Sequence, residues 1–234
     1  MPKYKLLTVD NAKTIKGEKL GYLTGILYLA PANESGVMNV CPMATAECKA
    51  ACLFTAGHGR MPVVRNRRVE RTRWLHRDRA GFMAALQEDI GVLIRKAKRD
   101  GMTPVFRLNG TSDLAWIPAQ LAPLFPDVTF YDYTKLPRPW QRVTGNYTLT
   151  FSYSGHNWAD CVDALAHGVN VAAVFETKRG QPLPETWQGY RVVDGDLNDL
   201  RFLDDKGVIV GLRAKGEAVK QRSAFILPVL QQVA

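Results

Sequence analysis

Three of the four cysteines lie within twelve residues of one another. Cys41, Cys48 and Cys52 form a C-x6-C-x3-C pattern. On a helical turn, residues four apart such as Cys48 and Cys52 point to the same side, and Cys41 approaches from the preceding loop. Three thiolates that converge on one point are typical ligands of iron–sulfur clusters and of zinc. The pattern also fits three buried thiols that serve only as small apolar side chains.

The number of protein ligands separates a zinc site from a cluster with an open iron. A structural zinc site has four protein ligands, and here the fourth would be Cys161 or His58. Cys161 lies in a helical pattern, where it would equally suit the hydrophobic core. If neither residue contributes, the three cysteines leave one iron of a cluster open to bind a substrate or cofactor.

The composition predicts a cytoplasmic protein of one domain, or a phage-encoded protein of the host cytoplasm. The chain has 234 residues, and neither a signal peptide nor a membrane-spanning apolar run is apparent. Thiols stay reduced in the cytoplasm, where clustered cysteines more often bind metal. The net charge of +9 favours a nucleotide or nucleic acid as partner, although it also fits solubility alone. No pattern indicates an oligomeric state.

Short apolar segments, each followed by a polar cluster, recur along the chain. Near-continuous apolar runs of this kind are typical of parallel strands that are buried on both faces. Helical connectors are expected at 116–124 and 158–166. The alternation predicts an α/β fold, a partial or complete parallel β/α barrel. The candidate strands are 24–33, 103–113, 128–135, 147–155, 170–178, 190–196 and 207–216, with a further short strand at 5–9.

A basic segment, residues 65–79, continues into an amphipathic helix, so that a basic helix is expected over 65–100, ended by Gly101. Its arginines fit either a solvated helix face or a patch that binds phosphates. The apolar residues that fall on one helical face are Phe82, Leu86, Ile90, Leu93 and Ile94.

In parallel β/α barrels the chemistry lies at the C-terminal ends of the strands. The polar clusters of this chain would therefore open onto the same mouth as the Cys loop, residues 34–60. Asn, Gly, Ser and Asp are ordinary turn residues, but Lys135, Lys178, Lys215 and Glu176 are not. Lys135 and Lys178 are candidate catalytic residues, as a base or a Schiff-base amine, in a barrel enzyme whose Cys loop is only structural.

A cysteine triad in the loop after the first strand of an α/β barrel resembles the radical S-adenosylmethionine superfamily. In that superfamily three cysteines hold a [4Fe–4S] cluster, and S-adenosylmethionine chelates the free iron. The usual spacing is C-x3-C-x2-C, from which this chain departs, and the resemblance covers mainly residues 24–216. The whole sequence is also similar to a group of phage and plasmid proteins that share a Cys-rich loop, a G-[TD]-[SD]-like turn and a Y-T-K strand end.

The resemblance implies a cofactor site at the strand ends. The turn from Asn109 to Asp113, NGTSD, takes the place of the superfamily's glycine-rich turn, which meets the methionyl amino group. Gly110 would let the backbone approach the ligand, and Ser112 and Asp113 would accept hydrogen bonds from an ammonium.

The later strand ends would bind the rest of S-adenosylmethionine. Ser152 and Ser154 would face its ribose or carboxylate, and Glu176 or Asp194 would hold ribose hydroxyls. The cations that would bind carboxylate or phosphate groups are Lys135, Lys178, Arg213 and Lys215.

The resemblance also implies a reaction class. An external electron donor would reduce the cluster, the sulfonium would be cleaved, and a 5′-deoxyadenosyl radical would abstract hydrogen from a nucleotide or nucleic-acid substrate. An alternative from another class is a zinc-stabilised nucleic-acid-binding protein without catalysis, which would use the same cysteines and the same basic helix in a closed four-ligand site.

Overall fold

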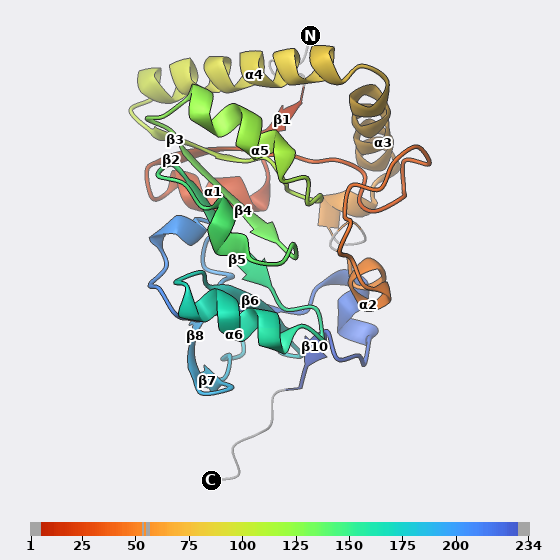
Figure 1. Cartoon of the computed structure of the whole chain (residues 1–234), viewed down its shortest axis with the longest axis vertical. Coiled ribbons are helices and arrows are strands. Elements are labelled where there is room, and N and C mark those ends of the chain that lie inside the picture. The colour runs from red at the N-terminus through yellow and green to blue at the C-terminus, as the bar shows by residue number, and fades with distance from the viewer. Residues whose placement is uncertain (1–5, 53, 55–56, 229–234) are drawn as a thin grey trace.

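The computed structural model of the chain describes residues 6–52, 54 and 57–228. In this part of the chain ten strands form one open, mostly parallel sheet in the order β1-β2-β3-β4-β5-β6-β9-β8-β7, with β10 paired to β6 (Figure 1). The strands are β1 (Leu7–Thr8), β2 (Tyr22–Leu27), β3 (Thr103–Arg107), β4 (Thr129–Thr134), β5 (Tyr147–Ser152), β6 (Val171–Phe175), β7 (Thr186–Trp187), β8 (Tyr190–Asp194), β9 (Ile209–Arg213) and β10 (Ile226–Leu227).

The alternation of strands and helices predicted from the sequence is confirmed as a mixed α/β fold. Each of the seven candidate strands overlaps an observed strand, and the pairs from β2 through β6 to β9 and β8 are all parallel. Only β1 and β7, at the two edges, pair antiparallel. The short strand expected at 5–9 is seen as β1. The first residue of the expected range, Lys5, lies outside the described residues.

The helices are α1 (Ala12–Glu18), α2 (Ala46–Ala50), α3 (Pro62–Arg77), α4 (Arg79–Arg99), α5 (Trp116–Leu121) and α6 (Trp158–Ala166). Short 3-10 helices lie at Gly57–Arg60, Ala122–Leu124, Pro139–Arg142, Arg201–Leu203 and Gly216–Lys220. Both expected connectors are therefore helical, and α1 was not predicted. No helix of the described residues is long and apolar enough to cross a membrane.

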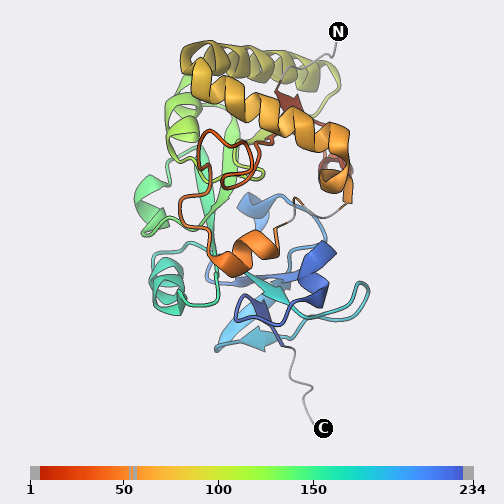
Figure 2. The same cartoon turned by 90° about the vertical axis from the view of Figure 1, so that its right-hand side faces the viewer.

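The prediction of one continuous basic helix over 65–100 is wrong in one respect. The segment forms two helices, α3 and α4, that meet at Asp78. The backbone of Asp78 is not helical (φ −141°, ψ 78°), and its Oδ1 accepts a hydrogen bond from the Gly81 amide at 2.9 Å, which caps α4. The predicted apolar face of α4 is buried, with Ile94 partly buried. The break lets α4 lie along the end of the sheet while α3 turns toward the C-terminal ends of the strands (Figures 1 and 2).

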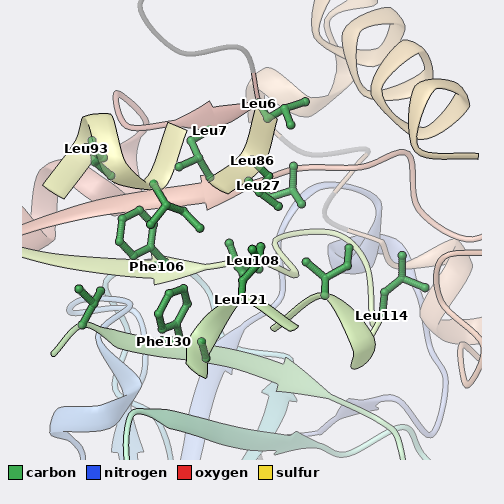
Figure 3. Packing of buried hydrophobic residues seen from close by; sticks show 14 of the residues in the cluster. Leu6, Leu7, Leu27, Leu86, Leu93, Phe106, Leu108, Leu114, Leu121 and Phe130 are labelled. Carbon is green, nitrogen blue, oxygen red and sulfur yellow. The ribbon is translucent and has the colours of Figure 1, made fainter. Parts of the chain in front are cut away.

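One face of the sheet carries the hydrophobic core beneath α4 and α5 (Figure 3). Phe106 of β3 stacks on Phe130 of β4, with ring centroids 5.4 Å apart, and both side chains are fully buried. Leu86 and Leu93 of α4 belong to the same cluster. A second cluster under α6 joins β5, β6 and β9. Burying each such side chain contributes about 1.5–3 kcal/mol to stability.

The opposite face is bridged by the segment 195–203, which follows β8. Leu200 and Phe202 of this segment pack against Tyr22, Val105 and Tyr131, which lie on β2, β3 and β4. The connection after β8 therefore reaches back across the sheet to its first parallel strands.

Strands β5 and β6 are staggered. The last residues of β5, Phe151 and Ser152, pair with the first residues of β6, Val171 and Ala172. Strand β10 pairs with the end of β6, where Ile226 lies opposite Val174. Ile226 also packs with Ala218 and with Ala51 beside the Cys loop. The C-terminal segment thus joins the Cys loop to the end of β6.

Candidate functional site

A cavity of about 350 Å³ opens at the C-terminal ends of the parallel strands. Figure 2 looks toward the side of the molecule where α2 lies below α3, next to the C-terminal segment. The cavity brings together most of the residues singled out from the sequence. Those that line it are Cys41, Cys48, Cys52, Asn109, Gly110, Ser112, Asp113, Lys135, Ser152, Arg213 and Lys215.

Four predicted site residues lie outside the lining of this cavity. Ser154 is buried in a turn, where its amide donates to Asn157 Oδ1 at 2.7 Å. Glu176 and Lys178 are exposed beyond the end of β6. Asp194 is held by Arg213, whose Nη1 lies 2.9 Å from both carboxylate oxygens. None of these four residues therefore lies where it would contact a ligand bound in the cavity.

The Cys loop is tied to the neighbouring strand ends by its backbone and by Cys41. The Sγ of Cys41 accepts a hydrogen bond from the Ala32 amide at 3.3 Å and lies 3.6 Å from the Thr111 carbonyl. The Val40 carbonyl accepts from the Asp113 amide at 2.7 Å. These contacts hold the loop directly against the NGTSD turn.

Helix α2 positions the second cysteine. Thr45 precedes the helix with extended backbone, and its hydroxyl accepts a hydrogen bond from the Cys48 amide at 3.1 Å, which is a standard N-cap. Cys52 lies just beyond the helix end, and its amide donates to the Lys49 carbonyl at 3.3 Å. The helical turn expected around Cys48 is therefore present, with Cys52 outside it.

The three thiols lie within electrostatic reach of one another in a mostly apolar setting. The pKa of Cys41 is raised to about 11, chiefly by burial and to a smaller extent by the neighbouring Cys52 and Cys48. Burial also raises the pKa of Cys52, against the opposing effect of Lys135 and Arg68. In the described part of the chain, no three Cys, His, Asp or Glu side chains are arranged to coordinate a metal ion. The thiols share one cavity without forming a closed ligand set.

Neither residue considered as a fourth metal ligand reaches the cavity. Cys161 is fully buried in the core under α6, and burial raises its pKa to about 12. His58 is exposed on the 3-10 helix Gly57–Arg60 and does not line the cavity. Of the described residues that line the cavity, the sulfur donors are the three loop cysteines, and none is a histidine.

Asn109 and Ser112 organise the NGTSD turn rather than point freely into the cavity. Asp132 Oδ1 accepts from the Asn109 amide at 2.7 Å, and Asp132 Oδ2 accepts from Asn109 Nδ2 at 3.2 Å. Asn109 Oδ1 in turn accepts from the Ser112 hydroxyl at 2.8 Å and from the Leu114 amide at 2.9 Å. Both residues are buried, so their main contribution is a fixed backbone.

Gly110 permits the close approach of this turn to β2. A Cβ at position 110 would lie 2.7 Å from side-chain atoms of Ile26 and Tyr28, and 2.8 Å from the Leu27 carbonyl oxygen. The Gly110 amide donates to that carbonyl at 2.9 Å. Any larger residue would push the turn away from β2 and from the Cys loop.

Asp113 joins the ends of β3 and β4. Its Oδ1 accepts from the Thr134 hydroxyl at 2.8 Å, and its Oδ2 accepts from the Lys135 amide at 2.7 Å. Each carboxylate oxygen has a second lone pair that these bonds leave available. Asp113 therefore fixes the backbone of Lys135 while its carboxylate stays on the cavity wall.

One wall of the cavity is an ion-pair network in which the cations already have acceptors. Arg213 contacts Asp194 and, at 3.2 Å, Asp196. Lys215 pairs with Asp196, and Lys16 Nζ donates to the Asp196 carbonyl. Their charges are largely balanced within the protein.

Lys135 differs from these cations. In the described part of the chain it forms no ion pair, and its Nζ lies 5.8 Å from the centre of the Phe225 ring. It is half-buried at the end of β4, on the cavity wall. Its ammonium is therefore positioned to bind an anionic group that enters the cavity.

A family model described as gene product 88 matches residues 5–228. The chain belongs to the gene product 88 family. No curated protein and no solved structure matches it. The match to the gene product 88 model includes every described strand and every residue of the cavity lining, so the family is defined over the whole fold rather than over the Cys loop alone.

The gene product 88 fold also places a buried ion pair at the cavity, which the sequence analysis missed. Arg107 Nη1 lies 2.8 Å from Asp199 Oδ2, and each side chain is 7% exposed. The guanidinium of Arg107 also lies over the Tyr133 ring, 4.5 Å from its centre. An arginine within the otherwise apolar run TPVFRLNG was the available signal, because a charge in a buried strand needs a partner.

The basic residues of α3 do not all face solvent. Arg65, Arg67, Arg73 and Arg77 are exposed, whereas Arg68 is buried. The sequence left two interpretations open, a solvated helix face and a patch that binds phosphates. Both therefore apply to the exposed arginines only, because Arg68 is enclosed by the protein.

Proposed function

We propose that this protein is an iron–sulfur enzyme of the radical S-adenosylmethionine type that acts on a nucleotide or a nucleic acid. One observation carries the proposal. The three cysteines of the loop after the first parallel strand line the same cavity as the polar ends of the strands that follow. Three sulfur donors without a fourth protein ligand suit a [4Fe–4S] cluster with one accessible iron.

The order of the strands supports a partial β/α barrel. Strands β2, β3, β4, β5, β6 and β9 are parallel neighbours in the order in which they occur along the chain. The segment 195–203, which follows β8, packs against β2, β3 and β4 and so links the far half of the sheet to its first parallel strands. Barrels of this kind place their chemistry at the C-terminal ends of the strands, where the cavity lies.

Three thiols are the donor groups that a cluster of this kind requires. Cys41, Cys48 and Cys52 would hold it, and the Ala32 amide would donate to the Cys41 sulfur, as amides commonly do at iron–sulfur sites. When bound and reduced by an external donor, the cluster would supply the electron for cleavage of S-adenosylmethionine. The zinc alternative needs a fourth ligand, but Cys161 lies in the core and His58 lies outside the cavity lining.

The chain's own residues would bind and orient the ligand and exclude water. The backbone of the turn 109–113 is fixed by Asp132 and lies against the Cys loop. The Ser152 side chain and the Asp113 carboxylate line the same cavity and can accept hydrogen bonds from ligand hydroxyl or ammonium groups. Phe225 and Tyr153 cover another part of the wall with aromatic surface.

The proposal is tested by purification and reconstitution of the whole protein without oxygen. We expect a brown protein with sulfur-to-iron charge-transfer absorbance, about four iron and four sulfide per chain, and formation of 5′-deoxyadenosine from S-adenosylmethionine when a reductant is added. A colourless protein that holds one zinc would favour the non-catalytic nucleic-acid-binding alternative. A protein that binds neither metal would leave the cysteines as structural residues.

Replacing Lys135 by methionine is expected to weaken the binding of S-adenosylmethionine to the reconstituted protein by about tenfold or more. The reason is that a charge-assisted hydrogen bond contributes about 1.5–3 kcal/mol. Equilibrium dialysis with labelled S-adenosylmethionine measures the affinity. The matched control is Lys178→Met, because Lys178 is exposed and lies outside the cavity lining. Equal affinities in the two variants would remove Lys135 from the binding site.

Reversing the charges of Arg67 and Arg77 on α3 is expected to weaken nucleic-acid binding at low salt. Both arginines are exposed, so each Arg→Glu change removes a cation that can contact phosphate. Fluorescence anisotropy with a labelled oligonucleotide over a salt series should show an affinity at least tenfold lower and a shallower salt dependence. The control is the double variant Arg179→Glu/Arg191→Glu, which changes the net charge equally at exposed positions outside α3. A similar loss in the control would assign the effect to net charge alone.

A further inference from the structure

Three polar residues, Arg107, Asn198 and Asp199, line the cavity together and form what we call the Arg107 triad. Arg107 is the last residue of β3, and the other two lie in the segment 195–203 after β8. Arg107 Nη1 lies 2.8 Å from Asp199 Oδ2, and each side chain is 7% exposed. Because the two charges neutralise each other, this part of the cavity suits an uncharged polar group better than an anion.

Arg107 has more hydrogen-bond donors than its neighbours use. A guanidinium carries several N–H groups, and among the described residues Asp199 is the one acceptor that Arg107 reaches. The guanidinium lies over the Tyr133 ring, 4.5 Å from its centre, which holds the guanidinium plane in place. Its Nε is buried without a partner in the described part of the chain. Since buried polar groups are nearly always hydrogen-bonded, the unused donors of an arginine on a cavity wall indicate a ligand with an acceptor.

Asn198 and Asp199 add a donor and an acceptor to the same wall. Asn198 Oδ1 accepts from the Leu200 amide at 2.8 Å and from Arg201 Nη2 at 3.3 Å, so its side-chain amide has a fixed orientation. Among the described residues, its Nδ2 has no acceptor. The Asp199 carboxylate accepts from Arg107, and a carboxylate can accept several hydrogen bonds at once. The Arg107 triad therefore combines one acceptor with donors from two neighbouring side chains.

The hydrogen-bonding pattern of the triad restricts the ligand that it can bind. Two donors and one acceptor are complemented by an uncharged edge that has two acceptors and one donor. Among the nucleic-acid bases, uracil and thymine present this set as a CO–NH–CO edge. Cytosine has no N–H at the central position, and adenine has no carbonyl group. Enzymes that act on a base read such an edge by hydrogen bonds in a pocket, and a wrong base would leave the buried groups of the pocket unpaired.

We propose that the Arg107 triad binds the CO–NH–CO edge of uracil or thymine and so selects the base that enters the cavity. The proposal rests on the proposed function for the nucleotide as substrate, and it deepens that function by naming the base. It requires neither the loop cysteines nor a metal. It also gives the buried ion pair of Arg107 and Asp199 a role in binding besides its role in stability.

The test measures the binding of three nucleotides to the metal-free whole protein by isothermal titration calorimetry. They are uridine 5′-monophosphate, 3-methyluridine 5′-monophosphate and cytidine 5′-monophosphate, which share ribose and phosphate and differ at the base edge. The uridine nucleotide should bind about tenfold or more tightly than either of the others, because only its base has an N–H for Asp199. A short single-stranded oligouridylate, measured in parallel, distinguishes a nucleic acid from a free nucleotide as the source of the base, and tighter binding of either one supports the proposal.

Two variants assign this preference to the triad. Asn198→Asp removes the Nδ2 donor but keeps an oxygen for the Leu200 amide, and it should reduce the preference for uridine over cytidine nucleotide about fivefold or more. The matched control is Asn66→Asp, the same change at an exposed position outside the lining of this cavity, which should keep the preference. The double variant Arg107→Met/Asp199→Leu removes both charges together, so it should fold and lose the preference.

The proposal is overturned if the three nucleotides bind the wild type equally, if none of them binds, or if Asn198→Asp keeps the full preference. These outcomes are independent of the iron–sulfur cluster. A protein that forms the cluster but does not distinguish the bases would overturn this proposal alone. A protein that selects the uridine nucleotide but binds no iron would overturn the radical mechanism and leave the base selection in place.

Discussion

Replacing Cys41, Cys48 or Cys52 by serine is expected to abolish incorporation of the proposed iron–sulfur cluster, whereas Cys161→Ser should retain it. Each loop cysteine lines the cavity, and a cluster that is held by three thiolates cannot spare one of them. A serine hydroxyl is a poor ligand at neutral pH because it stays protonated. Cys161 is enclosed by the core under α6, so its replacement should change stability rather than iron content.

The measurement is iron and sulfide per chain after anaerobic reconstitution, together with visible absorbance and circular dichroism. We expect less than about one tenth of the wild-type iron in each loop variant, with an unchanged far-ultraviolet spectrum, because metal ligation rather than the fold is lost. Cys161→Ser is the matched control for the chemical change itself. Loss of iron in Cys161→Ser equal to that in the loop variants would indicate four protein ligands and no open iron.

The parts of the site that could be predicted depend on local sequence signals. The loop cysteines are close in sequence, so their proximity in space follows from chain geometry alone. The polar residues after β3 and β4 come at the ends of long apolar runs, and parallel pairing brings such ends to one edge. Neither signal depends on the exact register of the strands.

The positions of the predicted residues that lie outside the cavity lining depend on strand register and on competing partners. Ser152 lines the cavity, but Ser154 lies past the end of β5, in a turn held by Asn157. Glu176 and Lys178 follow β6 where the chain leaves the sheet. Asp194 faces Arg213, a partner 19 positions away along the chain. A polar cluster in the sequence does not show at which of its residues the preceding strand ends.

The interior on the cavity side of the sheet could not be predicted at all, because its contacts are distant in sequence. Arg107 and Asp199 are separated by 92 positions. Tyr131 and Tyr133 extend the same polar layer, and their hydroxyls are buried without partners among the described residues. Arg107, Tyr133 and Asp199 of this layer line the cavity. The stability of the fold and the shape of the site are therefore linked through this layer.

Replacing Asp199 by alanine is expected to lower the free energy of unfolding by about 3–5 kcal/mol, because it leaves Arg107 as an uncompensated buried charge. Both side chains of the pair are only 7% exposed, so water cannot replace the lost carboxylate. Urea denaturation, followed by tryptophan fluorescence, measures the difference in stability. The same variant should also lose ligand binding, since both residues line the cavity.

The matched control is Asp205→Ala, which removes the partner of Arg191 from a pair whose side chains are 58% and 73% exposed. An exposed ion pair contributes about 0–1 kcal/mol, so this variant should remain close to the wild type in stability. The double variant Arg107→Met/Asp199→Leu should recover most of the stability lost in Asp199→Ala, because it removes both charges together. It should not recover ligand binding if the ion pair shapes the cavity floor. Equal stability losses in Asp199→Ala and Asp205→Ala would show that water reaches the Arg107–Asp199 pair, and that the pair does not stabilise the contact between β3 and the segment 195–203.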